Sequence, residues 1–314
     1  MDPPAVPKNE DSLRGLGYAL TAYVLWGFLP LYMKAVGHIS PAEVIAHRVL
    51  WSLPIAGAVV LILRRTDDLK AALRTPRVLL MAALTAALIS VNWGIYVWAI
   101  INDHALDAAL GYYINPLFSV FLGAVLLKER LSPAQKGAIV LALLAVAVLT
   151  YEAGRLPWLS LGLTVTWGFY AYFRKTLPVG PNQGFFLEVL ILCVPALGYV
   201  LYLQNTGLGH FGTTGWRDMA LLVGCGVVTA GPLMIYANGA KLLKLSTIGI
   251  LQYIAPSMIF ALAVFWFGEP FGSARMVAFP LIWMALVIYS VSMFRQARAS
   301  RQPSEKPLWT EVRQ

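Results

Sequence analysis

Ten apolar stretches, each about 20 residues long, follow one another along this chain and leave room for only short loops between them. A helix of this length and character crosses the hydrocarbon core of a bilayer. Charged residues make up only 12% of the chain, about half the fraction usual in soluble domains, which excludes a water-soluble globule. We therefore expect an all-α membrane protein with ten transmembrane helices near residues 15–36, 42–63, 77–101, 107–127, 133–150, 158–177, 184–203, 217–240, 246–267 and 274–294.

The basic residues predict how the chain is oriented. Of the 24 Lys and Arg residues, 19 fall in segments that face the cytoplasm if the N-terminus is cytoplasmic. Lys34, Arg155, Arg217 and Arg275 fall on the other side, and Arg48 lies within a span. This bias follows the positive-inside rule, so we expect both termini in the cytoplasm of a bacterium and the helices in its inner (plasma) membrane. Because the net charge of +9 sits in short loops, it does not indicate nucleic-acid binding.

The two halves of the chain repeat one another at a nearly constant offset in the numbering. Since five spans separate equivalent points, the second copy is inserted upside down, an arrangement typical of transporters. We expect an N-terminal cytoplasmic segment at 1–14, five-helix repeats at 15–150 and 151–295, and a basic disordered tail at 296–314. The matching segments are 114–116 with 254–256, 95–96 with 235–236, and 26–28 with 167–169, together with Glu129 and Glu269.

Two prolines at equivalent places in the repeat indicate where a cavity could lie. Pro116 and Pro256 fall near the middle of the fourth and ninth spans. Each frees the carbonyl four residues earlier, at Tyr112 and Gln252. A free carbonyl at membrane depth has to face protein or a wet cavity. The pair therefore predicts a midplane cavity between these spans, although ordinary helix kinks are the alternative.

Several longer motifs stand together at residues 46–52, 92–93, 98–100, 110–117, 252–256 and 267–270. In this combination, from about residue 14 to 295, the sequence resembles the RarD-type permeases, which belong to the EamA branch of the drug/metabolite transporter superfamily. The resemblance implies ten helices, two EamA repeats and permease activity, but no particular substrate. One departure is Lys128, which stands where the family signature has Gly before Glu129.

Polar and aromatic residues at helical spacing are the candidates for a substrate site. A cavity lined by Tyr, Trp, Asn and Gln suits an amphipathic or aromatic solute. The alternative is that these side chains form structural hydrogen bonds between helices. The predicted substrate-binding residues are Asn92, Tyr96, Tyr112, Asn115, Tyr236 and Gln252, with Trp26 and Trp167 as stacking surfaces and Arg48 as a charged contact.

Ionisable residues inside the spans are the candidates for coupling to protons. Arg48 and Glu188 occupy equivalent positions in the two halves, so they could form an ion pair between the repeats, contact substrate, or reach the nearby interface. His47 follows Glu43 by four residues and could titrate, or it could belong to a structural cluster with Glu43 and Arg48. Glu188 and His47 are therefore the proton-coupling candidates.

Two further features predict structural roles. Glu129 and Glu269 lie at helix ends, where a carboxylate can cap the amides of the following helix. Ala138, Ala142 and Ala145 form a small-residue face that allows close helix packing, either within the chain or in a dimer.

The sequence contains no His-Glu-x-x-His, Gly-x-Ser-x-Gly or Walker motif, so we expect no enzyme, no cofactor and no metal site. The inverted repeat predicts a secondary transporter that moves a small metabolite or an amphipathic, aromatic compound by alternating access. The family resemblance favours export, with uptake as the alternative direction. A solute-binding or accessory membrane subunit is the alternative function. The expected partners are the small-molecule substrate and the lipid bilayer, without nucleic acid, and the chain is expected as a monomer or a homodimer.

Overall fold

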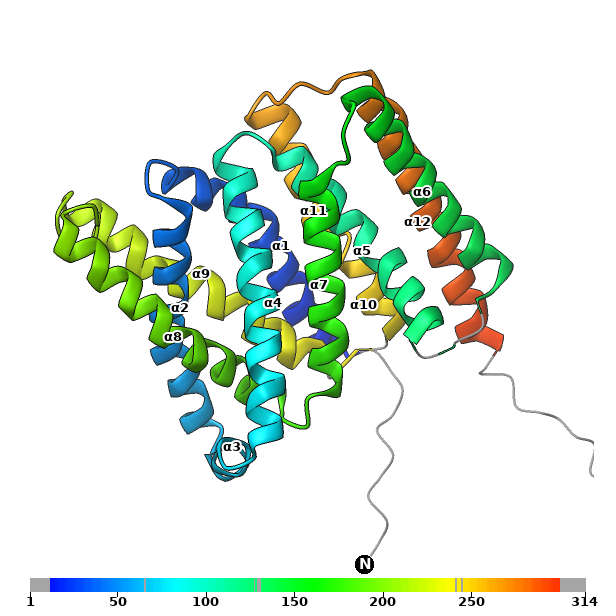
Figure 1. Cartoon of the computed structure of the whole chain (residues 1–314). Helices are drawn as coiled ribbons and strands as arrows, with labels where there is room; N and C mark the ends of the chain where they lie inside the picture. The colour runs from blue at the N-terminus through cyan, green and yellow to red at the C-terminus, as the bar shows by residue number, and fades with distance from the viewer. Residues whose placement is uncertain are drawn as a thin grey trace, which may run out of the picture.

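The computed structural model describes residues 12–64, 66–126, 128, 131–240, 242–243 and 245–299, in which every regular element is a helix (Figure 1). The helices are α1 (Leu13–Ala35), α2 (Pro41–Ile62), α3 (Thr66–Leu73), α4 (Pro76–Ile101), α5 (Ala105–Leu126), α6 (Pro133–Ala153), α7 (Trp158–Thr176), α8 (Pro181–Thr206), α9 (Trp216–Ala240), α10 (Leu245–Leu251), α11 (Ile254–Ala261), the π-helical turn η1 (Leu262–Trp266) and α12 (Ser273–Ala299).

Within the described ranges, eight helices are long and apolar enough to cross a membrane, namely α1, α2, α4, α5, α6, α8, α9 and α12. They coincide with eight of the ten predicted spans. The predicted sixth span corresponds to α7, which is less apolar because it carries Ser160, Thr164 and Thr166 and, near its end, Arg174 and Lys175. Ser160 and Thr164 are buried, and α7 packs along α4 and α5, so these hydroxyls contact protein rather than lipid.

The predicted ninth span, 246–267, is not one continuous helix. The structure divides it into α10, a turn at Gln252 and Tyr253, α11 and η1. The break at Gln252 and Tyr253 lies three to four residues before Pro256, which has no N–H to donate to the Gln252 carbonyl. The proline therefore interrupts this segment, whereas its counterpart Pro116 lies inside the uninterrupted helix α5.

The helices form a bundle in which neighbours in space are often distant in sequence. α1 packs against α9 and α11, α2 against α8 and α9, and α5 against α7 and α11. Figure 1 shows α8 and α9 at one edge of the bundle and the α6–α12 pair at the other, with α1, α4 and α7 between them. The start of α1 and the end of α12 lie at the same end of the bundle.

The alanine face of α6 packs within the chain. Ala138, Ala142 and Ala145 are buried, and α6 packs along α12 for most of its length. α6 begins with a capping box, in which the Ser132 hydroxyl accepts from the Gln135 amide and the Gln135 side chain accepts from the Ser132 amide. The start of α6 at Pro133 agrees with the start of the predicted span 133–150.

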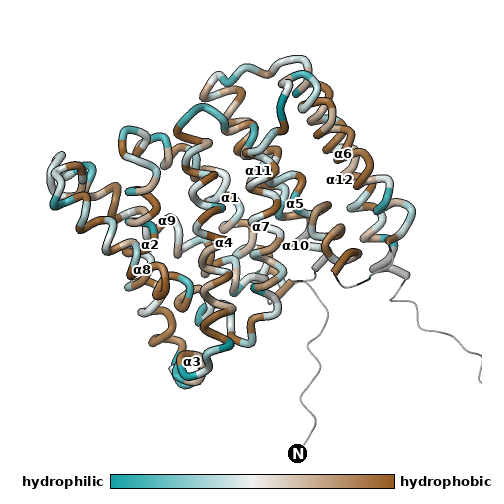
Figure 2. Tube along the Cα trace, in the orientation of Figure 1, coloured by the Kyte–Doolittle hydropathy of each residue, from teal (hydrophilic) through white to brown (hydrophobic). Residues whose placement is uncertain are grey.

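The outer surface of the bundle is apolar. Along α6, Val140, Leu143 and Leu144 are 53%, 64% and 49% exposed, and Val194 on α8 is 76% exposed. Figure 2 shows hydrophobic residues along the helices and hydrophilic residues gathered towards the helix ends and loops. A surface of this kind is stable only against lipid, so the chain is a multi-pass membrane protein.

Candidate functional site

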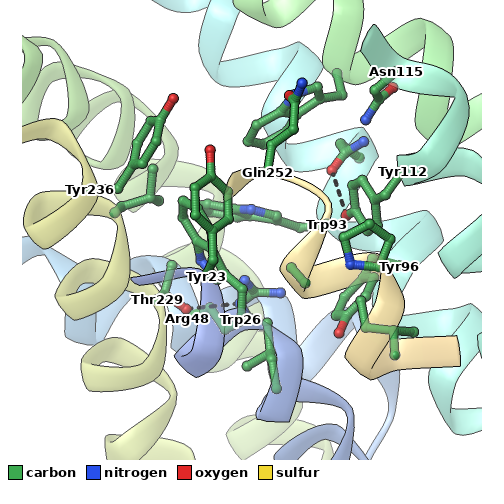
Figure 3. Close-up of a pocket in the computed structure, with 17 residues that line it drawn as sticks. Tyr23, Trp26, Arg48, Trp93, Tyr96, Tyr112, Asn115, Thr229, Tyr236 and Gln252 are labelled. Atoms are coloured by element: carbon green, nitrogen blue, oxygen red, sulfur yellow. Dashed lines mark hydrogen bonds between the residues drawn. The ribbon is translucent and has the colours of Figure 1, made fainter. Parts of the chain in front are cut away.

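A cavity of about 160 Å³ lies within the bundle, between the two halves of the chain (Figure 3). The first half contributes side chains from α1, α2, α4 and α5, and the second half contributes side chains from α7, α9 and the broken segment around α11. The lining residues are Tyr23, Trp26, Leu29, Arg48, Asn92, Trp93, Tyr96, Tyr112, Asn115, Trp167, Thr229, Leu233, Tyr236, Gln252, Ala255, Pro256 and Ile259.

All nine residues predicted to bind substrate line this one cavity: Trp26, Arg48, Asn92, Tyr96, Tyr112, Asn115, Trp167, Tyr236 and Gln252. Their role in binding stays a prediction. The cavity is not formed by the fourth and ninth spans alone, because five other helices also contribute to its wall. Pro256 lines it, whereas Pro116 is buried in α5 and is not one of the lining residues.

Arg48 brings the only charge into the described wall of the cavity. Its side chain is almost fully buried in α2, with a residue exposure of 3%. The Nε atom donates to Thr229 Oγ1 at 2.9 Å, and the guanidinium lies 4.7 Å from the centroid of the Trp93 ring. The cation is therefore held by a neutral hydroxyl and an aromatic face, which attracts it through the ring quadrupole.

Asn92 positions the aromatic wall. Its amide nitrogen donates to the Leu163 carbonyl at 3.1 Å and to Thr166 Oγ1 at 2.9 Å, which ties α4 to α7. Its amide oxygen accepts from the Tyr112 hydroxyl at 3.4 Å. Asn92 thus lines the cavity. It also forms hydrogen bonds between helices, which was the alternative role predicted for it.

Aromatic rings form two groups around the cavity. Tyr23, Trp26 and Tyr236 contact one another with centroid separations of 5.4–5.5 Å. On the other wall, the Tyr112 ring lies 5.9 Å from Tyr96 and 6.3 Å from Trp167. Such faces suit a flat or apolar solute.

Three polar atoms in the wall are buried without a hydrogen-bond partner: Arg48 Nη1, the Tyr96 hydroxyl and Asn115 Oδ1. Buried polar groups are nearly always paired, so three unpaired groups around one cavity are unusual. The first is a donor, the second can donate or accept, and the third is an acceptor. The cavity therefore offers hydrogen bonds that a polar solute could complete.

Glu188 lies outside this cavity, and it does not pair with Arg48. Glu188 is 1% exposed, with Oε1 3.3 Å from Arg174 Nε and Oε2 accepting from the Tyr170 hydroxyl at 3.2 Å. The suggested ion pair between Arg48 and Glu188 was therefore wrong, because each side chain has its own partners.

His47 also lies outside the cavity. Its Nδ1 accepts from Trp51 Nε1 at 3.1 Å, and its ring stacks on Phe211 at 5.0 Å, while Nε2 has no partner. Glu43 is bound by another histidine, His210, so the proposed cluster of Glu43, His47 and Arg48 is not formed.

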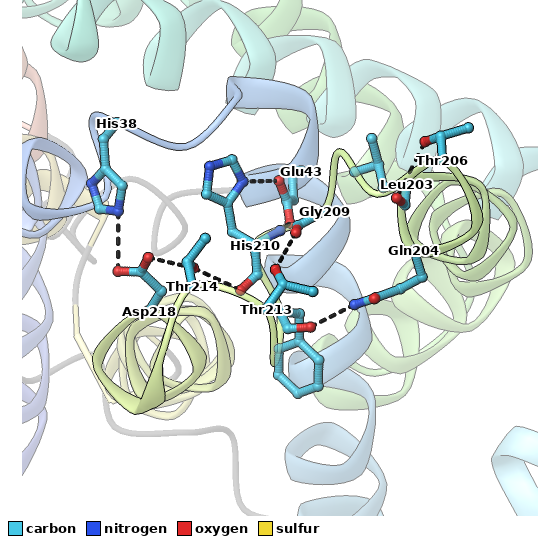
Figure 4. A network of polar contacts seen from close by, with 11 residues as sticks. His38, Glu43, Leu203, Gln204, Thr206, Gly209, His210, Thr213, Thr214 and Asp218 are labelled. Atoms are coloured by element: carbon cyan, nitrogen blue, oxygen red, sulfur yellow. Dashed lines mark hydrogen bonds and ion pairs between the residues drawn. The ribbon is translucent and has the colours of Figure 1, made fainter.

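Glu43 belongs to a polar network at one end of the bundle (Figure 4). Its carboxylate accepts from the His210 amide at 2.7 Å and contacts His210 Nδ1 at 2.8 Å. Nearby, Asp218 contacts His38 Nε2 at 3.0 Å and accepts from the Thr214 hydroxyl at 2.6 Å. Both carboxylate–histidine contacts join the first half of the chain to the second.

Glu269 caps a helix, as predicted, but not the following one. Its two carboxylate oxygens accept from the amides of Ala105 at 2.6 Å and Leu106 at 2.9 Å, at the start of α5 in the other half of the chain. A carboxylate at this position satisfies two free amides and complements the helix dipole. Glu129 lies outside the described residues.

Among the polar and aromatic lining residues, three were not predicted from the sequence: Tyr23, Trp93 and Thr229. Two of them had a usable signal: Tyr23 lies one helical turn before Trp26, and Trp93 follows Asn92 in a motif of the family. Thr229 had no such signal. No group of three or more His, Cys, Asp or Glu side chains that could hold a metal ion occurs in the described part of the chain.

Comparisons with known proteins place the chain among membrane transporters. Residues 13–151 match the EamA-like transporter family. The chain is 42% identical to Protein RarD of Streptomyces exfoliatus, over 94% of this chain and 94% of that protein. It is 39% identical to an uncharacterized transporter of Vibrio cholerae, over 94% and 98%, and 37% identical to Protein RarD of Escherichia coli, over 93% and 99%.

A solved structure has a similar fold. Its title reads "Crystal structure of protein", and it superposes with a TM-score of 0.58 over 91% of this chain and 99% of that one. The two sequences are 22% identical, so this likeness concerns the fold alone.

Proposed function

Because this chain belongs to the RarD-type branch of the EamA-like transporter family, we propose that it is a secondary transporter of the bacterial plasma membrane. It moves a small metabolite or an amphipathic, aromatic compound by alternating access, in the export direction. The observation that carries this proposal is the cavity, which both halves of the chain line with aromatic rings and unpaired polar atoms.

The mechanism requires two inverted five-helix repeats, and several contacts support them. Gly27 of α1 lies against Met258 of α11, and Gly168 of α7 lies against Phe118 of α5. The two glycines occupy equivalent positions in the two halves of the sequence, and so do their two partners. Both contacts run between the halves, and equivalent residues make them in exchanged roles, as expected if the two halves are related by a pseudo-two-fold axis.

The pair α6 and α12 supports the same repeat. Ala138 and Ala145 of α6 are fully buried, and so are Ala278 and Ala285, which are their equivalents on α12. α6 and α12 pack on each other, and both helices bury small residues at equivalent positions. Together with the basic residues, this arrangement supports ten membrane-crossing segments with both termini in the cytoplasm.

Alternating access also requires contacts that close one end of the cavity and can break. The network of Figure 4 supplies such contacts, because Glu43–His210 and His38–Asp218 join segments from the two halves. Under the proposed orientation this end faces away from the cytoplasm. We propose that these contacts form when the site is closed to the outside and separate when it opens.

Transport by purified protein in liposomes tests the proposal. Uptake and efflux of labelled amino acids, nucleoside-like metabolites and amphipathic drugs are measured with and without a proton gradient. Tyr112→Ala and Asn115→Ala remove lining groups, and Tyr151→Ala is the matched control, because Tyr151 is 92% exposed at the far end of α6. We expect saturable flux of one compound class that is lost in the two cavity variants and retained in the control.

If folded and correctly inserted protein gave no flux of any compound, the proposed transporter function would be contradicted. Binding without flux would instead favour the alternative function, a solute-binding or accessory subunit. Proton coupling through Glu188 or His47 stays a prediction. Unchanged dependence on the pH gradient in both Glu188→Gln and His47→Gln would contradict it.

A further inference from the structure

We infer that the cavity selects solutes with one net negative charge on an aromatic or apolar body, and that Arg48 is the residue that binds the anionic group. The inference rests on the proposed function, since it names the substrate class of the same cavity. Two arginines inside the bundle, the buried Arg48 and the partly buried Arg174, differ in their partners.

The protein supplies a carboxylate to one of these cations and not to the other. Arg174, with a side chain 17% exposed, is paired with Glu188. Arg48 is buried more deeply, and none of the described carboxylates forms an ion pair with it. Charged side chains within a membrane bundle are normally paired or directed at a water-filled cavity. Arg48 lines the cavity, so a solute can provide the missing anion.

The neighbours of Arg48 leave donors available for that anion. Thr229 accepts from Nε, and its own hydroxyl donates to the Cys225 carbonyl at 2.7 Å, so it is a neutral partner. Trp93 covers the guanidinium face, while Nη1 stays unpaired. The hydroxyl of Tyr96 is a second unpaired group in the same wall. Two such donors can bind the oxygens of a carboxylate.

The acidic residues on nearby helices are occupied elsewhere. Glu43, on the same helix as Arg48, is bound by His210, and Glu188 on the adjacent α8 is bound by Arg174 and Tyr170. Within its described lining, the cavity contains one cation and no carboxylate. A solute with an ammonium group therefore finds no counter-ion there. The rings of Trp26, Tyr112 and Trp167 suit the uncharged body of the solute.

The test compares four probes with a common aromatic body: 3-phenylpropionate, its neutral amide, the zwitterion phenylalanine and the cation 3-phenylpropylamine. Dissociation constants are measured at fixed ionic strength and neutral pH by quenching of tryptophan fluorescence, since Trp26, Trp93 and Trp167 line the cavity. We expect the anion to bind about 10- to 100-fold more tightly than the amide, the range for a hydrogen-bonded charge. The zwitterion and the cation bind more weakly than the anion.

Two variants remove the charge preference by different routes. Arg48→Gln removes the cation, and Thr229→Asp places a carboxylate beside it that occupies the guanidinium from within the protein. We expect the preference for the anion to disappear in both, and Arg48→Lys to retain part of it. Lys70→Gln is the control, because it removes the same charge from the exposed helix α3, away from the cavity. If Arg48→Gln fails to fold, Thr229→Asp alone tests whether the preference for the anion depends on the Arg48 guanidinium.

An anion that binds no better than the amide, including no binding of either, would overturn the inference. So would equal binding of phenylalanine, or a preference that survives in Thr229→Asp. Flux of labelled 3-phenylpropionate into liposomes, net of empty liposomes, separates this inference from the proposed function. Transport without charge preference would support the proposed transporter function and contradict the anion site. Selective binding of the anion without flux of any compound would support the anion site and contradict the proposed transporter function.

Discussion

The backbone of Gly27 in α1 lies directly against the side chain of Met258 in α11. A Cβ atom at position 27 would lie 2.7 Å from the Cβ of Met258, closer than two carbon atoms can pack. The contact lies beside Trp26 and Ile259, which both line the cavity. The close approach of these two helices therefore helps set the width of the site.

Gly27→Ala should destabilise the protein by about 1–3 kcal/mol, the usual effect of overpacking a closely packed contact. Met258 Cβ is close to its own backbone, so α11 itself would have to move. The measurement is the thermal unfolding temperature in detergent. Gly17→Ala in the same helix is the control, because a Cβ there meets no atom within 4 Å. Equal unfolding temperatures for the two variants would contradict the contact.

Lys128→Gly should stabilise the protein by about 0.5–1 kcal/mol, because Lys128 has a left-handed backbone conformation that disfavours residues with a Cβ. Its φ is +55°, and Gly268, the equivalent residue in the second half of the chain, has a φ of +67°. The departure from the family signature thus leaves a lysine in a conformation suited to glycine. Lys128→Ala keeps the Cβ and should give no gain. A lower unfolding temperature for Lys128→Gly would disprove this explanation.

Asn92→Ala should lower stability by about 1–2 kcal/mol and reduce transport, because it removes two hydrogen bonds between helices and the partner of Tyr112. Thr166→Val removes only one acceptor and should lower stability by roughly 0.6 kcal/mol. A double-mutant cycle between the two positions measures their coupling. Additive effects within error would show that the contact contributes nothing.

The shared location of the nine cavity residues could be predicted from the sequence, because helical spacing and the internal repeat together constrain which helix faces point inward. Asn92 and Tyr96 are four residues apart, and Tyr112 and Asn115 three apart, so each pair shares a helix face. The repeat then directs equivalent faces of the two halves inward. What the repeat does not specify is how far each helix approaches the others, which is why the cavity involves more helices than the two prolines indicated.

Partners of the charged residues could not be predicted in the same way. His47 stacks on Phe211 and Glu43 binds His210, and in both cases the partner comes from the loop before α9. Those contacts depend on the tertiary packing of α2 against α9, which no local pattern encodes. Similarly, Pro256 indicated a freed carbonyl at Gln252, but whether the helix would kink or break there depends on its neighbours.

Glu43→Ala should open the cavity towards the end of the bundle shown in Figure 4. The change removes both acceptors of His210, at 2.7 Å and 2.8 Å, and so weakens a contact between the two halves. Under the proposed mechanism the population open to that side should rise roughly fivefold, as for loss of about 1 kcal/mol of differential stability.

A single cysteine reports this opening. Cys193→Ser and Cys225→Ala remove the two free cysteines, and Leu233→Cys places a thiol in the cavity wall. The rate of labelling by a membrane-impermeant maleimide, added outside intact cells, should rise in Glu43→Ala. Asp103→Asn is the matched control, because Asp103 pairs with Lys34 within the first half of the chain, and Asn tolerates its φ of +61°. Faster labelling in Asp103→Asn than in Glu43→Ala would mean that contacts between the halves do not hold this end closed.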